Sequence, residues 1–248
     1  MFPVTPIPNS IFRKYRIEYI FPFFYSHTVK TMKKTKIKIC GLTIPAQAVA
    51  VEEAGADMIG LVFADSPRRV SIEQATDISG ALKSARAIGV FVNSTPSEIN
   101  RIAEVAGLEA AQLHGDEPPE MVRELAIPYI KAFKVTGPDF IDEIKSWISR
   151  CGNRAPEAVL LDTFSIEAAG GTGKTFNWEY LGNACLSEAM DDLPPFILAG
   201  GLCSENITEA IITLHPWAVD CSSGVEAEPG IKDIGKVKLF IRTVQAAL

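Results

Sequence analysis

The chain has 248 residues, which is enough for one large α/β domain or two smaller ones. Its 24 basic and 30 acidic residues give a net charge of -6, which argues against a nucleic-acid-binding surface. The five cysteines form no C-x-x-C pair and the three histidines lack metal-ligand spacing, so we expect a reducing compartment, no disulfide framework and no metal.

Residues 1–31 differ in composition from the rest of the chain, being rich in aromatic residues, proline and basic residues. Their most apolar stretch, residues 17–25, is too short to cross a bilayer and is interrupted by Glu18 and Pro22, so we expect no membrane association. We interpret 1–31 as a disordered or targeting-like extension, or as the result of a start assigned upstream of Met32. The expected location is cytoplasmic, or a plastid or another organelle if the extension is a transit peptide.

From residue 36 onward, short apolar runs alternate with longer stretches that have helical spacing and begin at Ser, Thr, Asp or Pro. The pattern predicts strands over residues 36–40, 58–63, 86–92, 110–113, 129–135, 158–162, 196–199 and 218–221. It predicts helices over residues 44–54, 71–84, 96–106, 118–126, 139–150, 178–190, 204–214 and 231–247.

Eight strand–helix units in a domain spanning 32–248 are typical of a single (β/α)8 TIM barrel near its minimum size. The nearly continuous apolar strands fit a parallel sheet that is covered by helices. A doubly wound open sheet is the alternative. In a barrel, functional groups should gather at the carboxyl ends of the strands and in the loops that follow.

Polar and small residues follow most of the predicted strands. They are Cys40, Arg68, Asn93, His114, Asp116, Asp162, Gly200, Gly201, Ser222, Ser223 and Gly224. A free cysteine is more often a small buried apolar residue than a catalytic one, and His114 and Asp116 fit a structural hydrogen-bonding role. Strand alternation, however, turns Cys40 and Lys38 toward the barrel axis, together with Asp162 and Asp220. Because the last strand neighbours the first in a closed barrel, we predict an ion pair between Lys38 and Asp220.

Two glycine-containing stretches, at 198–202 and 221–226, follow the last two strands, where barrels bind phosphate with backbone N–H groups. Two ordinary turns are the alternative reading. A third stretch, 168–178, lacks the spacing of a nucleotide-binding P-loop and fits a mobile lid over the barrel mouth.

Seven blocks in chain order closely resemble the phosphoribosylanthranilate isomerase family, a family of sugar isomerases in tryptophan biosynthesis. The blocks are KICGLT, GLVFADSPRRVS, GVFVN, AAQLHGDE, LLDTFSIEAAGGTGKTFNW, LAGGLCSENI and VDCSSGVEAEPGIKD. The resemblance implies a (β/α)8 barrel without a cofactor. The implied reaction is an Amadori rearrangement of N-(5-phosphoribosyl)anthranilate to 1-(2-carboxyphenylamino)-1-deoxyribulose 5-phosphate.

Carried over residue by residue, the resemblance places the general base at Cys40 and the general acid at Asp162. It places the contact to the anthranilate carboxylate at Arg68, in preference to its neighbour Arg69. The phosphate contacts fall on Gly200, Gly201, Ser222, Ser223 and Gly224. Cys221 departs from the family pattern, and by alternation it should face the helices. The expected partner is the phosphosugar-anthranilate substrate, bound by a monomer or a homodimer.

The chemistry requires a protonated Asp162 to open the ribose ring and a Cys40 thiolate to remove a proton from the adjacent carbon. A thiolate at neutral pH calls for electropositive surroundings, and Lys38 is the candidate to provide them. The nearest enzyme alternatives are an epimerase and the indole-forming synthase of the same pathway. Neither the paired carboxylates or histidines of the first nor the lysines with glutamates of the second lie at these strand ends. A phosphate-binding protein without catalytic activity is the remaining alternative.

Overall fold

The computed structural model describes residues 34–163, 179–187 and 189–247. The chain divides into two units, Met1–Met32 and Lys33–Leu248. The extension predicted for 1–31 and the lid predicted for 168–178 lie outside the described residues. No helix within the described ranges is long and apolar enough to cross a membrane.

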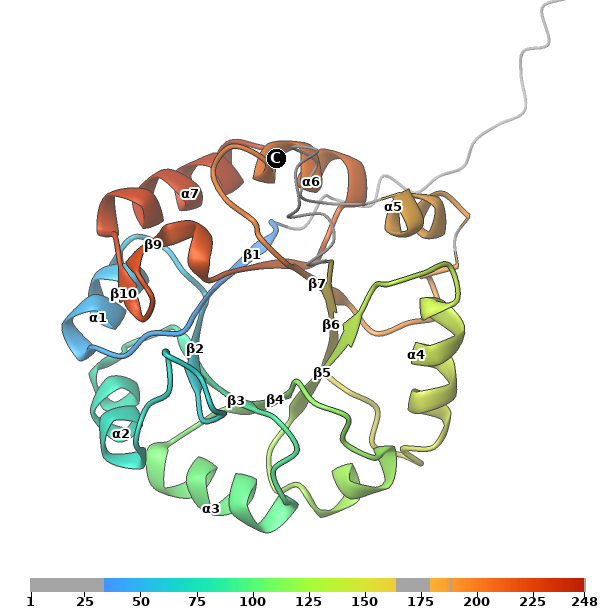
Figure 1. Ribbon diagram of the computed structural model, residues 1–248, viewed down its shortest axis with the longest axis horizontal. Coiled ribbons are helices and arrows are strands. Elements are labelled where there is room, and N and C mark those ends of the chain that lie inside the picture. The colour runs from blue at the N-terminus through green and yellow to red at the C-terminus, as the bar shows by residue number, and fades with distance from the viewer. Residues whose placement is uncertain (1–33, 164–178, 188, 248) are drawn as a thin grey trace, which may run out of the picture. The chain divides into compact units, whose positions relative to one another are not determined.

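Eight parallel strands form a closed barrel in the order β1 to β8, as Figure 1 shows. Their bounds are β1 Lys36–Cys40, β2 Met58–Val62, β3 Arg86–Phe91, β4 Ala110–Leu113, β5 Tyr129–Lys134, β6 Ala158–Asp162, β7 Phe196–Ala199 and β8 Ala218–Cys221. The prediction of a TIM barrel is therefore confirmed, and each predicted strand lies within one residue of its observed bounds.

Helices surround the barrel on its outside (Figure 1). Their bounds are α1 Pro45–Glu53, α2 Ile72–Ala81, α3 Pro96–Ala106, α4 Phe140–Ser149, α5 Glu179–Leu186, α6 Ile207–Leu214 and α7 Ile234–Ala246. Side chains cap the first turns of several of these helices. Ser71 and Gln74 form a capping box at the start of α2, and the Asp233 carboxylate accepts two backbone N–H groups at the start of α7.

Two parts of the predicted helix pattern are wrong. Residues 118–126 form no α-helix but a short 3-10 helix, η2 (Pro119–Glu124), because prolines at 118, 119 and 128 remove backbone donors and restrict the residue before each of them. The helix predicted over 231–247 begins three residues later, at Ile234. It is preceded by a short 3-10 turn, η3 (Ser223–Val225), and a hairpin of β9 (Glu226–Glu228) and β10 (Ile231–Lys232).

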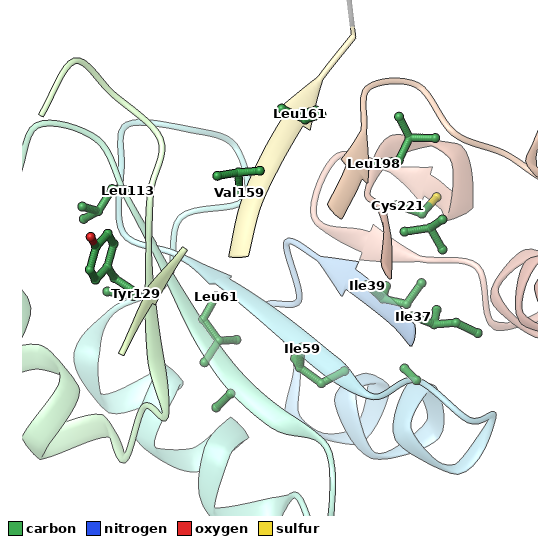
Figure 2. Packing of buried hydrophobic residues seen from close by; sticks show 14 of the residues in the cluster. Ile37, Ile39, Ile59, Leu61, Leu113, Tyr129, Val159, Leu161, Leu198 and Cys221 are labelled. Atoms are coloured by element: carbon green, nitrogen blue, oxygen red, sulfur yellow. The ribbon is translucent and has the colours of Figure 1, made fainter. Parts of the chain in front are cut away.

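The core has two layers separated by the strands. The outer layer lies between strands and helices and contains Ile37 and Ile39 of β1 (Figure 2). The inner layer fills the barrel and contains Leu160 and Ala218. Alternation along the strands thus runs as predicted, and Cys221 packs in the outer layer, where its Sγ lies 3.1 Å from the Leu202 carbonyl oxygen.

Candidate active site

Cys40 closes β1 and lies inside the barrel near its carboxyl end. Its side chain packs with Val62 and Val90, which end the next two strands on the same inner face. Gly60 of β2 makes room for it, since a Cβ at that position would lie 2.6 Å from the Cys40 Sγ. Only 9% of Cys40 is exposed, so the thiol is within reach of the mouth but largely shielded from water.

The electrostatic environment of Cys40 differs from the prediction. Burial raises the pKa of the thiol, while the nearby Lys38 ammonium opposes this rise and the Asp220 carboxylate adds to it. The net shift is upward, so the thiol form dominates at neutral pH. The expected electropositive neighbour is present, but its effect on the pKa is smaller than that of burial.

Lys38 and Asp220 form the predicted ion pair inside the barrel. They lie opposite each other in the register of β1 and β8, and Lys38 Nζ donates to Asp220 Oδ2 over 2.9 Å. Their side chains are 0% and 9% exposed. Burial alone would lower the pKa of Lys38, but the interactions with Asp220 and Cys40 together outweigh burial, and the pKa is raised. Lys38 therefore carries a fixed positive charge beneath Cys40.

Asp162 ends β6, and its side chain is a quarter exposed at the barrel mouth. Its Oδ2 lies 3.7 Å from Nε2 of His114, which follows β4. The other ring nitrogen of His114, Nδ1, is 2.8 Å from the Gln112 side-chain amide, and Gln112 is buried in the barrel. His114 thus combines the predicted structural hydrogen bonding with a position beside Asp162.

A cavity of about 700 Å³ opens beside Asp162 toward α4, and its wall includes His114 and Trp147. Cys40 and Arg68 are not among its lining residues. Near its base, Lys131 Nζ lies 2.9 Å from Glu117 Oε2, and both side chains are buried.

The two glycine turns lie next to each other at the ends of β7 and β8. Gly200 and Gly201 have φ angles of 99° and 58°, a region that favours glycine. A Cβ on Gly224 would collide with the carbonyl oxygen of Leu202, so the turns are packed backbone against backbone. Ser222 donates its hydroxyl to the Cys40 carbonyl oxygen over 3.0 Å, which ties the second turn to β1.

Arg68 lies in the loop after β2, and its aliphatic stem crosses the backbone at Gly41. A Cβ on Gly41 would lie 2.5 Å from Arg68 Cδ, so glycine is required directly after Cys40. The guanidinium forms a bidentate ion pair with Glu226, and Lys232 Nζ binds the same carboxylate over 2.8 Å. Arg69 instead lines a separate hollow beside α2 and α3.

Two charged residues at this rim escaped the sequence analysis, Glu226 and Lys232. Both are buried, with exposures of 7% and 3%. The arginine and lysine contacts, together with the Gly230 N–H, outweigh burial and lower the pKa of Glu226 to about 2. The only signal for them in the sequence is an acidic and a basic residue on either side of a short turn, directly after the last glycine turn. The two strands that carry them are too short to show alternation. Among the described residues, no cluster of His, Cys, Asp or Glu could hold a metal ion.

A sequence model of the family described as N-(5'phosphoribosyl)anthranilate (PRA) isomerase matches residues 37–243. The chain belongs to this family. The N-(5'-phosphoribosyl)anthranilate isomerase of Geobacter metallireducens is 43% identical over 213 residues, which cover 85% of this chain and 99% of the relative. That of Trichlorobacter lovleyi is also 43% identical, over 216 residues that cover 86% of this chain and 99% of the relative.

Solved structures agree with the family assignment. The phosphoribosyl anthranilate isomerase of Thermotoga maritima has a TM-score of 0.75 and 38% identity, covering 86% of this chain and 99% of the other. Another phosphoribosyl anthranilate isomerase, solved in complex with reduced 1-(o-carboxyphenylamino)-1-deoxyribulose 5-phosphate, has a TM-score of 0.72 and 36% identity over the same shares. The resemblance read from the seven sequence blocks to this isomerase family is therefore confirmed.

Proposed function

We propose that this phosphoribosylanthranilate isomerase family member rearranges N-(5-phosphoribosyl)anthranilate to 1-(2-carboxyphenylamino)-1-deoxyribulose 5-phosphate, an isomerisation step of tryptophan biosynthesis. The observation that carries the proposal is the meeting of four features at one barrel mouth. These are a cysteine ending β1, a carboxylate ending β6, an arginine beside the cysteine, and paired glycine turns after β7 and β8.

In the proposed reaction, Asp162 donates a proton to the ribose ring oxygen as the C1–O bond breaks, which opens the ring to a protonated Schiff base. Cys40 then removes the proton from C2, and the electron pair neutralises the iminium nitrogen to give an enolamine. Protonation at C1 and loss of the C2 hydroxyl proton give the ketone. The reaction is internally balanced in protons and electrons, so side chains alone can supply its acid and base.

Binding at both ends would place the sugar between the acid and the base. The glycine turns offer backbone N–H groups to the phosphate, at the barrel position where phosphate binding is common. Arg68 suits a planar carboxylate because its guanidinium can bind two oxygens at once. Two fixed ends restrict the ribose carbons to the space between Cys40 and Asp162, which lowers the entropic part of the barrier.

The test is the loss of substrate fluorescence on adding the purified chain without metal or nucleotide. Cys40→Ala and Asp162→Asn should each lower kcat by about 10²-fold to 10⁴-fold, the range for loss of a general acid or base. A product analogue should still bind to both variants. Matched controls are Cys203→Ala and Asp116→Asn, which change a cysteine and an exposed carboxylate outside the proposed machinery. Near-normal turnover in either catalytic variant would refute the assigned role.

A phosphate-binding protein without catalytic activity predicts no turnover by the wild type, although phosphate esters would still bind. We further propose that residues 32–248 carry the activity, as a monomer or homodimer in the cytoplasm, or in an organelle if 1–31 direct transport. Sedimentation of the purified chain distinguishes the two oligomeric states.

A further inference from the structure

The Arg68 guanidinium is held along one of its two binding edges. Nε donates to Glu226 Oε1 over 2.8 Å, and Nη2 donates to Oε2 over 2.6 Å. This side-on contact uses Nε and one hydrogen of Nη2. No described residue accepts a hydrogen bond from Nη1 in the structure. The end-on edge, formed by Nη1 and the second Nη2 hydrogen, therefore stays available for another planar anion.

Glu226 is itself held in place by hydrogen bonds from groups other than Arg68. Lys232 lies opposite it in the register of β9 and β10, and Lys232 Nζ donates to Glu226 Oε1 over 2.8 Å. The Gly230 N–H donates to the same oxygen over 3.2 Å, and Lys232 Nζ also reaches the Ser222 carbonyl oxygen. In Figure 1 this hairpin lies beside α1 and α7. The Glu226 carboxylate is thus anchored to the end of β8 and cannot follow a moving arginine.

The charges in this cluster do not balance. Arg68 and Lys232 supply two positive charges, and Glu226 supplies one negative charge. The Lys232 side chain is 0% exposed and depends on Glu226 for its counter-charge, whereas Arg68 is 25% exposed. The surplus positive charge therefore resides at the more exposed end of the cluster, on Arg68.

The stem of Arg68 is fixed as well, because it lies on Gly41 with no room for a Cβ beneath it. The Arg68 side chain is thereby held at two places. Its aliphatic stem lies against Gly41, the residue after Cys40, and the side edge of its guanidinium binds Glu226. A long, mobile arginine would otherwise lose side-chain freedom on binding a substrate, at a cost in affinity.

We propose that Glu226, braced by Lys232, is a positioning residue that presents the end-on edge of Arg68 to the carboxylate of the substrate's aromatic ring. Glu226 thereby sets the preference of the enzyme for a carboxylated substrate over the same phosphoribosylamine without the carboxylate. The inference rests on the proposed function and assigns a specificity role to a residue that need not touch the substrate.

The experiment compares two substrates, N-(5-phosphoribosyl)anthranilate and N-(5-phosphoribosyl)aniline, with the full-length wild type and Glu226→Gln. The substitution keeps the shape of the side chain but removes its charge, and the amide nitrogen that it introduces cannot accept from Arg68. We expect KM for the carboxylated substrate to rise about tenfold or more, with a smaller change in kcat, as for loss of a charge-assisted contact. The constants for the aniline substrate should stay within about twofold, a factor that distinguishes them from the tenfold effect.

The matched control is Glu228→Gln, which makes the same change two residues along β9 at an exposed side chain. It should leave the preference for the carboxylated substrate unchanged. A second variant, Glu226→Asp, keeps the charge on a shorter side chain and should give an intermediate KM, so the inference can still be tested if Glu226→Gln impairs folding. In an Arg68→Ala background, Glu226→Gln should add no further loss of preference.

Equal losses on both substrates would overturn the inference, because they would mean that Glu226 only supports the neighbouring turn after β8. Independent effects of Glu226→Gln and Arg68→Ala on the preference would also overturn it. A wild type that converts neither substrate would instead refute the proposed function, so the two failures are distinguishable.

Discussion

Replacing Lys38 by Met should destabilise the barrel strongly, because the change leaves the Asp220 carboxylate buried without its counter-charge. Lys38 Nζ donates to Asp220 Oδ2 over 2.9 Å, and the other oxygen, Oδ1, has no hydrogen-bond partner among the described residues. With exposures of 0% and 9%, neither side chain can turn to water. Loss of one partner of such a pair costs about 3–5 kcal/mol of the free energy of unfolding.

The assay is urea unfolding at pH 7, followed by far-ultraviolet circular dichroism. We expect Lys38→Met and Asp220→Asn each to lower the free energy of unfolding by several kcal/mol. The double variant removes both charges, so its loss should be smaller than the sum of the two single losses by about 2 kcal/mol or more, within the range of contacting pairs. Lys36→Met is the control, because Lys36 is exposed on the same strand.

Additive losses in the double variant would refute the reasoning, since they would show that the two groups contribute independently. A loss for Lys36→Met as large as that for Lys38→Met would also refute it, because the effect would then follow from removing any lysine from β1.

Three further predictions concern the same rim. At neutral pH, ionisation of Glu226 should contribute about 3 kcal/mol to the free energy of unfolding relative to the protonated carboxyl group, because its pKa lies near 2 instead of 4.5; urea unfolding should show this contribution intact above pH 4.5 and lost as the pH falls toward 2. Gly224→Ala should raise KM for the phosphorylated substrate and weaken inorganic phosphate binding, measured by calorimetry, because the new Cβ collides with the Leu202 carbonyl; unchanged binding would contradict the phosphate role. The rising limb of kcat/KM against pH should follow the ionisation of Cys40. Lys38→Met should move this limb to higher pH, because it removes the charge that lowers the thiol pKa; an unmoved limb would show that Lys38 does not act on the thiol.

The barrel could be predicted from the sequence because its signal repeats. Most strands are short, largely apolar runs, and several helices begin at Ser, Thr, Asp or Pro, so an error in one unit does not disturb the others. The exceptions have local causes. Prolines around η2 limit residues 118–126 to a 3-10 turn, and β9 and β10 are too short to show alternation.

Part of the candidate site could also be predicted from the sequence. A period of two along β1 and β8 is enough to place Lys38 opposite Asp220 and Cys40 at the mouth, and the structure has both. The contact between Arg68 and Glu226 could not be predicted, because these residues lie 158 positions apart, Arg68 in the loop after β2 and Glu226 in the short hairpin after β8. Their meeting depends on how the loops fold over the rim, which no periodic pattern encodes.

The direction of the Cys40 pKa shift was also beyond the sequence, because it is the net result of opposing effects. A lysine two residues away predicts a lowered pKa, but the same alternation that brings Lys38 inward also buries the thiol and brings in Asp220. A thiol with a raised pKa is seldom ionised at neutral pH, yet its thiolate binds an abstracted proton more tightly. A higher pKa thus lowers the fraction of Cys40 that is ionised but makes the thiolate a stronger base. Lys38 limits the rise of this pKa, and Asp220 helps to keep Lys38 charged in spite of its burial. A carboxylate on β8 therefore adds directly to the basicity that burial gives a thiol on β1, and it limits that basicity indirectly by keeping Lys38 charged.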